Sequence, residues 1–464
     1  MRIAYLSHFY PPNQNAGIEQ NTHAIASGML AAGHSVKVLC IATVKDPGYY
    51  HGFTEDEWEG VTVRRLKLSW QQPGQPTHNL FDNPFLADRV REFLLEFKPD
   101  LVHITSMYAL GARIAEVPDS LGLPSVMTLH DFWLICPRLT LKRHDGEICN
   151  GQVSALDCQD CLLKGSASYR ALQRVSSQAL LDKVYGSIIR KPGLATRMPG
   201  LRGWGVDVER RRSVIREGVG HIDHFLAPAR HIAGSIRDAG MPIDIEISPY
   251  GHRLDWLSRY QDRPADGELR FGFMGQVRPH KGVHLLIQGF QKNRFPENVK
   301  LRIYGGLEED PEYVFHLREL ARGNPNITFE GPFRRPEMPR VLPNIDVLVV
   351  PSTWPDVAPL VVHEAFAARK PVLASNMGGL PEFVRPGEGG LIFDVKDRGC
   401  SLAQVRRRDR ITPVVAAIRP CTDADEQKFL RLYRRLIADR ASNAWQVRFG
   451  RLPHGPNSRY ANRG

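Results

Sequence analysis

Residues 351–366 read PSTWPDVAPLVVHEAF, and this stretch predicts a strand that turns directly into a helix. The apolar run just before it, from Ile345 to Val350, is typical of a buried parallel strand. Pro355 and Pro359 interrupt the strand, and the apolar residues from Leu360 onward predict a helix. The sequence therefore indicates one strand–turn–helix unit of an α/β domain.

The start of this helix is suited to bind an anion. Pro359 and Leu360 open the helix, whose first backbone amides have no partner inside it and lie at the positive end of its dipole. Asp356 lies before the helix and Glu364 one turn inside it, so two carboxylates flank the same point. A diphosphate at the amides, with hydroxyl groups on either side for the carboxylates, describes a nucleotide sugar. The alternative is that Asp356 caps the helix and Glu364 is a solvated helix residue.

A second segment, KPVLASNMGGLPE at residues 370–382, predicts a strand that ends in Gly378, Gly379 and the carboxylate of Glu382. Together the two segments resemble the retaining glycosyltransferases of family 4. The resemblance implies the GT-B architecture, an α/β fold in which two Rossmann-like domains with doubly wound parallel sheets face a cleft. It also implies that Gly378, Gly379 and Glu382 contact the donor. The usual acid pair of the family is Glu-x7-Glu, and here Asp356 takes the first place.

The pattern along the chain supports two such domains. Predicted strands alternate with predicted helices in the first half of the chain and again in the second half. The length of 464 residues also exceeds that of one ordinary domain. The predicted units are an acceptor-side domain at 1–223 with a helical, cysteine-rich insertion at about 141–218, a donor domain at 224–398, and a C-terminal segment at 399–464. The donor domain is predicted to begin with the strand Phe225-Leu226-Ala227. A helix at 424–439 is expected to cross back to the first domain, as in the family, and the end from residue 448 is expected to be disordered.

Composition and charge narrow the range of partners. With 42% hydrophobic and 24% charged residues the chain is globular, and its net charge of +11 favours an acidic partner. The arginines at 210–216, at 406–410 and from Arg431 onward are either solvated helix faces or a basis for peripheral attachment to the inner membrane face. No signature of a nucleic-acid-binding module occurs. Since no signal peptide or apolar span is recognisable, we expect a cytoplasmic protein.

The loop GQVRPHKG, from Gly275 to Gly282, follows a predicted strand and precedes a predicted helix. Gly275 lets the backbone approach a phosphate, and Lys281 adds a point charge. In the family this loop supplies an Arg and a Lys to the donor diphosphate. The position directly after the glycine is Gln276 here, so Arg278 is the expected substitute. These cations would stabilise the charge that grows on the leaving diphosphate without a metal. Considered alone, the Lys-Gly pair would be an ordinary surface feature.

Two positions in the first half of the chain match the family as well. The loop PPNQNAGIE at residues 11–19 joins the first strand to the first helix, and the resemblance implies that Gly17 contacts the diphosphate or the acceptor. His130 ends the predicted strand from Ser125 to Leu129 and is therefore expected at the cleft. Taken alone it would be read as a structural histidine. It matches the interdomain histidine of the family, which lies against the transferred sugar and orients the reacting carbon.

Four cysteines end in a Cys-x2-Cys pair: Cys136, Cys149, Cys158 and Cys161. Persistent disulfides are not expected in a reducing cytoplasm, whereas four thiolates could hold a structural zinc ion. The spacing is irregular, so reduced thiols are the alternative. No other cofactor is expected.

The leading hypothesis is a retaining hexosyltransferase that moves a sugar from a nucleoside diphosphate sugar to a glycan or lipid-linked acceptor. The expected context is polysaccharide or glycolipid biosynthesis. The predicted catalytic residues are His130, Arg278, Lys281 and Asp356, and Glu364 is predicted to bind the donor ribose. Two alternatives stay open: an epimerase or phosphorylase on the same scaffold, and a non-catalytic protein that binds sugar nucleotides or glycans.

Overall fold

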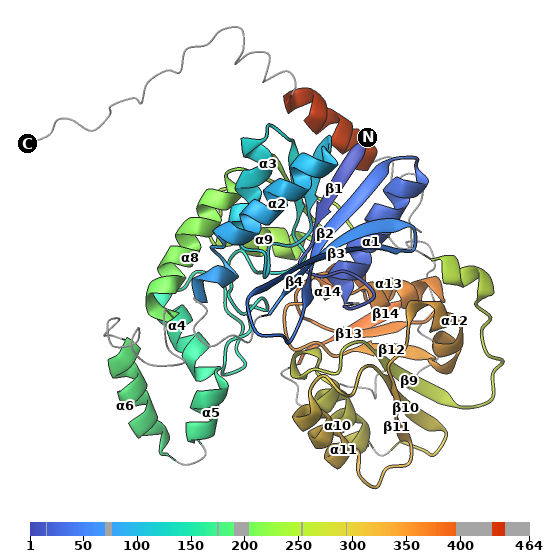
Figure 1. Cartoon of the computed structure of the whole chain (residues 1–464). Coiled ribbons are helices and arrows are strands. Elements are labelled where there is room, and N and C mark those ends of the chain that lie inside the picture. Colours follow the sequence, from blue (N-terminus) through green and yellow to red (C-terminus); the bar gives the residue numbers. More distant parts are fainter. Residues whose placement is uncertain are drawn as a thin grey trace, which may run out of the picture.

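The structure is a computed structural model that describes residues 1–14, 16–69, 77–173, 176–189, 204–251, 254–293, 295–395 and 429–440. Its strands form two sheets (Figure 1). The first has the order β3-β4-β2-β1-β5-β6-β7-β8 and is parallel except for the edge strand β3, which runs antiparallel to β4. The strands are β1 (Arg2–Leu6), β2 (Ser35–Thr43), β3 (Tyr50–Trp58), β4 (Val61–Leu68), β5 (Leu101–Ile104), β6 (Ser125–Thr128), β7 (His224–Ala227) and β8 (Ile245–Ile247).

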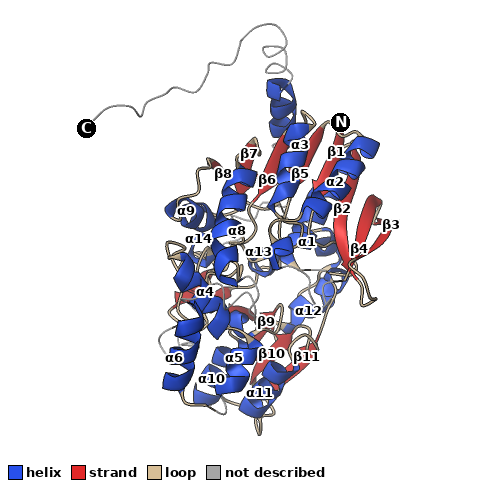
Figure 2. Ribbon diagram, turned by 60° about the vertical axis from the view of Figure 1, so that its left-hand side comes forward, coloured by secondary structure: helices blue, strands red, loops and turns tan. Residues whose placement is uncertain are grey.

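Both faces of the first sheet are buried, as alternate residues of β1 show. Ala4 and Leu6 belong to the apolar core that includes α2 (Pro84–Phe97), whereas Ile3 and Tyr5 belong to the core that includes α1 (Gly17–Ala31). Successive side chains of a strand point to opposite faces of its sheet. The sheet is thus covered by helices on both sides, as parallel sheets require (Figure 2).

The second sheet has the order β11-β10-β9-β12-β13-β14 and is entirely parallel. Its strands are β9 (Leu269–Met274), β10 (Val299–Tyr304), β11 (Ile327–Gly331), β12 (Val347–Val350), β13 (Val372–Ser375) and β14 (Gly390–Phe393). One face packs against α10 (Val283–Asn293) and α11 (Pro311–Ala321). The other packs against α12 (Met338–Val341), α13 (Leu360–Ala367) and α14 (Leu380–Phe383). The predicted fold of two Rossmann-like parallel-sheet domains is confirmed.

The predicted domain boundary between residues 223 and 224 is wrong. The strand Phe225-Leu226-Ala227, expected to open the second domain, lies in β7, which pairs with β6 of the first sheet. β8 pairs with β7 in turn, so the first sheet extends to Ile247, and the second begins at β9. The sequence of a short apolar strand does not show which other strand it pairs with, and this explains the error.

Between β6 and β7 the chain forms a helical segment rather than a short loop. It contains α4 (Ala155–Lys164), α5 (Ala167–Gln173), α6 (Gln178–Ile189) and α8 (Trp204–Val219), and α9 (Arg230–Asp238) follows β7. In Figure 1, α8 and α9 lie beside the first sheet, whereas α5 and α6 extend below it to the level of the second domain. The segment carries the predicted cysteine cluster and part of the predicted arginine cluster.

The arginines at the start of that cluster each have a partner within the protein. Arg210 donates from Nε to Asp82 at 2.9 Å, and the guanidinium of Arg211 lies 4.9 Å from the ring centre of Trp133. Arg212 donates to a backbone oxygen at 2.6 Å. Arg211 is buried and Arg212 partly buried, so these two side chains are not a solvated helix face, whereas the side chain of Arg210 is 48% exposed beside Asp82. The second predicted cluster, at 406–410, lies outside the described residues.

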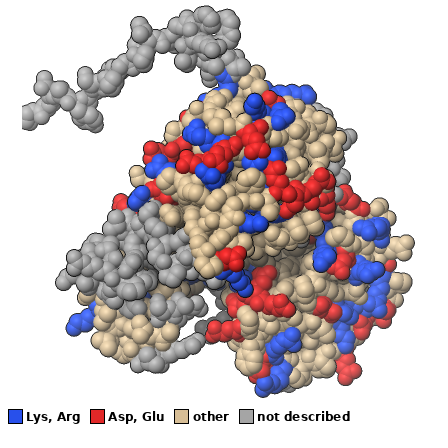
Figure 3. Space-filling view, in the orientation of Figure 1, with Lys and Arg blue, Asp and Glu red and all other residues tan. Residues whose placement is uncertain are grey.

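The described surface on the face drawn in Figure 3 gives no direct sign of membrane contact. No helix in the described part of the chain is long and apolar enough to span a bilayer. On the face shown in Figure 3, basic and acidic side chains are intermixed over both domains. The surface drawn there therefore gives the predicted peripheral attachment no support.

Residues 429–440 form a helix that returns to the first domain, close to the N-terminus in Figure 1. Leu430, Tyr433 and Leu436 belong to the same apolar core as residues of β1. The hydroxyl of Tyr433 lies 2.6 Å from Nδ1 of the fully buried His103. The predicted helix at 424–439 is present over its described part, and the predicted disordered end from residue 448 lies outside the described residues.

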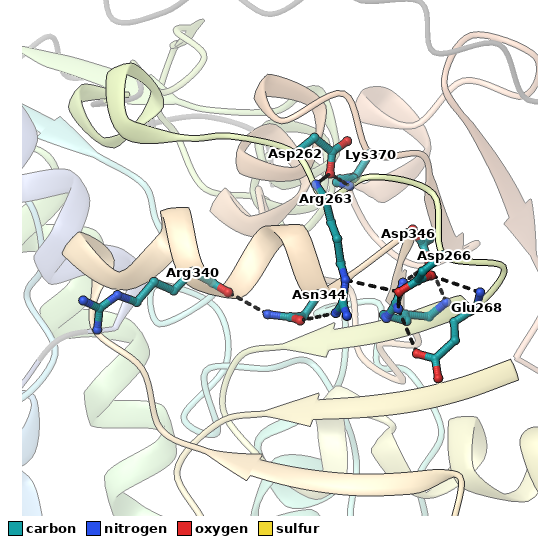
Figure 4. Close-up of polar contacts among 9 residues, drawn as sticks. Asp262, Arg263, Asp266, Glu268, Arg340, Asn344, Asp346 and Lys370 are labelled. Atoms are coloured by element: carbon teal, nitrogen blue, oxygen red, sulfur yellow. Dashed lines mark hydrogen bonds and ion pairs between the residues drawn. The ribbon is translucent and has the colours of Figure 1, made fainter. Parts of the chain in front are cut away.

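An ion-pair network holds the amino end of the second sheet (Figure 4). Arg270 near the start of β9 is 2% exposed, and its guanidinium contacts Asp266, Glu268 and Asp346. Parallel sheets bind ligands at the carboxyl ends of their strands. This dense cluster of carboxylates is therefore a structural anchor at the opposite end from the expected site.

We expect Tyr433→Phe to lower the free energy of unfolding by about 1–3 kcal/mol, because it leaves Nδ1 of the buried His103 without a partner. Urea unfolding followed by circular dichroism measures the loss. Phe315→Ala is a suitable control, since Phe315 is 66% exposed and should change stability little. Equal stability of Tyr433→Phe and the wild type would contradict this role for the C-terminal helix.

Candidate functional site

The donor loop, defined here as residues 351–359, connects β12 to α13 at the carboxyl edge of the second sheet. Helix α13 begins at Leu360, as predicted, and its N-cap is Pro359, which gives no side-chain cap. The first amides of the helix are therefore not occupied by a capping side chain. An uncapped helix N-terminus at this edge favours an anionic group.

Asp356 is fixed inside the donor loop by two polar contacts. Its Oδ2 accepts hydrogen bonds from Ser352 Oγ at 2.9 Å and from Lys281 Nζ at 2.6 Å. The residue is only 5% exposed. The structure thus brings together two of the predicted catalytic residues, from strand ends 75 residues apart in the sequence.

Glycines bring the neighbouring segments against the donor loop. A Cβ at Gly378, whose φ is +60°, would lie 2.4 Å from the carbonyl oxygen of Asp356. A Cβ at Gly282, whose φ is +75°, would lie 1.8 Å from the carbonyl oxygen of Pro351. Gly379 donates its amide to Asp356 at 2.7 Å. Gly378 and Gly379 therefore support the loop that carries Asp356, a role that the prediction of donor contact did not include.

The cations of the loop from Gly275 to Gly282 occupy different positions. Lys281 pairs with Asp356 and lies 5.0 Å from the ring centre of Trp354. Arg278 pairs with Glu309 at 3.2 Å and is more exposed. Gly275 directly follows β9 with a φ of +146°. Lys281 is thus the cation of this loop that contacts the donor loop. Arg278 instead pairs with Glu309, which lies just before α11.

Glu364 is buried on α13 next to an arginine that sequence reasoning missed. Its carboxylate lies 3.5 Å from Arg335, which donates in turn to Gln20 of α1 in the first domain at 3.2 Å. Burial raises the pKa of Glu364, and Arg335 lowers it in part. Glu364 is 5% exposed, so the reading as a solvated helix residue is wrong.

Glu382 joins the two domains. Its two carboxylate oxygens accept hydrogen bonds from the backbone amides of Arg230 and His231 at 2.8 and 2.6 Å. These are the first amides of α9, where the helix dipole favours a negative charge. The carboxylate predicted to contact the donor is therefore occupied by a helix N-terminus in this structure.

His130 lies just beyond β6 and keeps one ring nitrogen unpaired. Its Nδ1 is 2.5 Å from the hydroxyl of Tyr250, while the buried Nε2 has no partner among the described residues. Burial raises the pKa of Tyr250 far above its usual value, so the phenol keeps its proton and can donate it to Nδ1. Nε2 then carries the ring proton and is a donor for a ligand. A small cavity beside it is lined by Thr105, Thr128 and other residues.

Other unpaired polar atoms are buried at the same edge of the first sheet. Ser7 Oγ, His8 Nδ1 and Glu19 Oε2 have no partner among the described residues, although His8 Nε2 lies 3.2 Å from the other oxygen of Glu19. The proximity of His8 helps to lower the pKa of His130. Gly17 begins α1 close by in the sequence, and a Cβ there would meet nothing within 4 Å. Polar groups in such a position can bind hydroxyl groups of a ligand.

The cysteines do not form an evident metal site. Cys136, Cys149, Cys158 and Cys161 are free, and no group of three or more His, Cys, Asp or Glu side chains in the described ranges is placed to hold a metal ion. The geometry therefore gives the predicted zinc site no support.

The chain is similar in sequence to known glycosyltransferases. Residues 16–180 match the model described as glycosyl transferase 4-like domain, and residues 256–405 match that of glycosyl transferases group 1. An uncharacterized glycosyltransferase of Methanocaldococcus jannaschii is 22% identical over 403 residues, which is 84% of each chain. The glycogen synthase of Mycobacterium tuberculosis is 24% identical over 423 residues, 88% of this chain and 85% of that enzyme.

Solved structures share the fold. The sucrose-phosphate synthase from Thermosynechococcus elongatus has a TM-score of 0.64 at 18% identity and covers 94% of this chain and 99% of its own. HepE from Anabaena, solved with UDP and glucose, has a TM-score of 0.57 at 17% identity and covers 95% and 99%. The fold and these matches define a GT-B glycosyltransferase. The chain belongs to the group 1 glycosyl transferases, with a family 4-like first domain.

We expect Gly378→Ala to lower kcat/KM by about 10²-fold, since the added methyl collides with the Asp356 backbone and displaces the donor loop. The matched control is Gly387→Ala. Gly387 has a similar positive φ of +84°, but its Cβ would meet nothing within 4 Å. Steady-state kinetics of both variants, with thermal unfolding to exclude loss of fold, check the difference. Equal losses in the two variants would contradict the bracing role of Gly378.

We expect His130→Asn to lower kcat/KM by about 10-fold, the value of one lost hydrogen bond to a ligand, and by the same factor at every pH from about 5 to 8. Burial, aided by His103 and His8, lowers the pKa of His130 to about 3 in the folded protein. The ring is therefore neutral throughout that range, and its protonation begins only well below it. A ratio of wild-type to variant kcat/KM that changes near pH 6.5 would show that His130 titrates and acts as an acid or base.

Proposed function

We propose that the protein is a retaining hexosyltransferase that uses a nucleoside diphosphate sugar to glycosylate a hydroxyl group in polysaccharide or glycolipid assembly. The observation that carries the proposal is the contact between Lys281 and Asp356, 2.6 Å long, beside the uncapped start of α13. A cation, a carboxylate and free amides at one strand end suit the diphosphate and the sugar hydroxyls of such a donor. Solved neighbours support the donor class, since HepE was crystallised with UDP-glucose.

In this proposal the second domain binds the donor. The amides of Leu360 and the following residues, together with Lys281, bind the diphosphate and stabilise the charge that develops as it leaves. Asp356 binds a hydroxyl of the transferred sugar. Glu364, one turn inside α13, binds the ribose after release from Arg335. The contact between Lys281 and Asp356 holds both side chains in place before the donor arrives.

The first domain provides the acceptor side. His130 presents a neutral ring and orients the sugar through the N–H at Nε2. The unpaired atoms of Ser7, His8 and Glu19 bind acceptor hydroxyl groups near Gly17. A glycan or lipid-linked acceptor provides several such hydroxyl groups.

Product analysis tests the function. Purified protein is incubated with UDP-, GDP- and ADP-sugars and a panel of glycan acceptors, and the products are followed by NMR. The proposal expects release of nucleoside diphosphate only with an acceptor, and a new bond with the donor's anomeric configuration. An inverted bond, epimerisation without acceptor, a requirement for inorganic phosphate, or binding without turnover across the panel would each contradict it.

Lys281→Ala should lower kcat by about 10²-fold, because it removes a fixed positive charge from the leaving diphosphate. Lys300→Ala is a matched control, since Lys300 on β10 of the same domain bonds only Asn326 within the described chain. Initial rates at saturating donor, with unfolding temperatures for both variants, make the comparison. A fully active Lys281→Ala enzyme would exclude the proposed role.

A further inference from the structure

A short hairpin of the first domain, residues 138–149, positions a lysine at the donor loop. Lys142 and Ile148 form an antiparallel bridge, and Leu141 beside it is 3% exposed. The carbonyl oxygen of Lys142 accepts a hydrogen bond from Arg138 Nε at 3.1 Å, and Cys149 N–H donates to Leu141 at 2.7 Å. The backbone that carries the Lys142 side chain is therefore held by packing and hydrogen bonds.

The side chain of Lys142 reaches the second domain. Its Nζ donates to Thr353 Oγ1 at 2.6 Å, across 211 residues of sequence. Thr353 donates its own amide to the carbonyl oxygen of His280 at 2.8 Å, and its hydroxyl lies 3.1 Å from the same oxygen. Lys142 is thus attached to the point where the donor loop meets the loop that carries Lys281.

Three cations surround this point. The pKa of His280 is lowered to about 4, mainly by burial and then by Lys281, Lys142 and Arg278. Since His280 is neutral at physiological pH, the positive charge belongs to the three flexible side chains.

Only two of these cations have a carboxylate partner in the described chain. Lys281 pairs with Asp356 and Arg278 with Glu309. For Lys142, no ion pair and no further hydrogen bond of Nζ lies within the part of the chain that the structure describes. Burial of this ammonium without an anion lowers its pKa. An ammonium group in that situation gains free energy from an anionic ligand.

We propose that Lys142 binds the diphosphate of the donor from the first domain, so that the donor bridges both domains. The inference rests on the proposed function, because that function places a diphosphate beside Lys281. A diphosphate carries at least two negative charges, which match Lys281 on one domain and Lys142 on the other. Both cations then face the leaving group as its charge grows during transfer.

A donor bound by both cations also links the two domains. Lys142 reaches Thr353 only while the hairpin lies against the donor loop. A ligand that contacts both domains favours the arrangement in which this contact forms. A nucleoside without phosphate gains nothing from Lys142.

The test compares Lys142→Met with the wild type and with Arg143→Met. Arg143 is the neighbouring cation of the same hairpin and pairs with Asp145 at 3.7 Å, so its loss changes the net charge equally without reaching the donor loop. Calorimetric titration gives Kd for UDP, GDP and ADP and for the corresponding nucleosides. Lys142→Arg tests whether another cation restores binding.

We expect Lys142→Met to weaken binding of the preferred nucleoside diphosphate about 10-fold or more and to lower kcat/KM similarly. Its nucleoside affinity should stay unchanged, Arg143→Met should behave as the wild type, and Lys142→Arg should recover part of the loss. Unfolding temperatures identify a general loss of fold, which would lower nucleoside affinity too.

Two results separate the inference from the proposed function. If the wild type binds a nucleoside diphosphate and Lys142→Met binds it equally, the inference is wrong and the proposed function stands. A loss confined to donors with an acidic sugar also overturns it, because Lys142 would then bind the sugar carboxylate. If the wild type binds no nucleoside diphosphate, the proposed function fails and the inference fails with it.

Discussion

The contact between Lys281 and Asp356 is the interaction on which the site depends. It joins two strand ends of the second sheet, and the backbone on either side of it is packed too closely for side chains. Gly282 lies against the carbonyl of Pro351, and Gly378 lies against that of Asp356. Because the backbone fixes the distance between the two loops, aspartate reaches the lysine although its side chain is one methylene shorter than the usual glutamate.

The same donor loop forms much of the contact between the domains. The ring of Trp354 lies 6.5 Å from that of Phe132 in the first domain and 5.5 Å from that of His280 in the second. Val357 and Ala358 belong to the apolar core of the first domain. The geometry of the donor site therefore depends on the interface between the domains. The hydrogen bonds from the start of α9 to Glu382 are part of that interface.

The local parts of the site could be predicted from the sequence, because each is contained in one short segment. The donor loop, the start of α13 and the loop that carries Lys281 each combine a strand end, a turn and a helix start within a few residues. Tyr250, Arg335 and Lys142 could not be found in this way. Each meets its partner across more than 100 residues, as in the contacts Tyr250–His130, Arg335–Gln20 and Lys142–Thr353, and no local pattern encodes such a pairing. The partner of β7 was missed for the same reason.

The protonation states of the side chains at the domain interface determine the sign of the charge at the site. Burial lowers the pKa of His130 to about 3 and that of His280 to about 4, so both rings are neutral there. The carboxylate of Glu382 accepts hydrogen bonds from the N-terminus of α9, and that of Glu364 lies beside Arg335. Asp356 pairs with Lys281. These three negative charges are thus offset within the protein, and the ammonium of Lys142 adds positive charge. The ammonium of Lys142 lies near other cations at this interface, and an anion between the loops removes the repulsion among them. The charge at this interface therefore favours a phosphorylated donor over a neutral sugar.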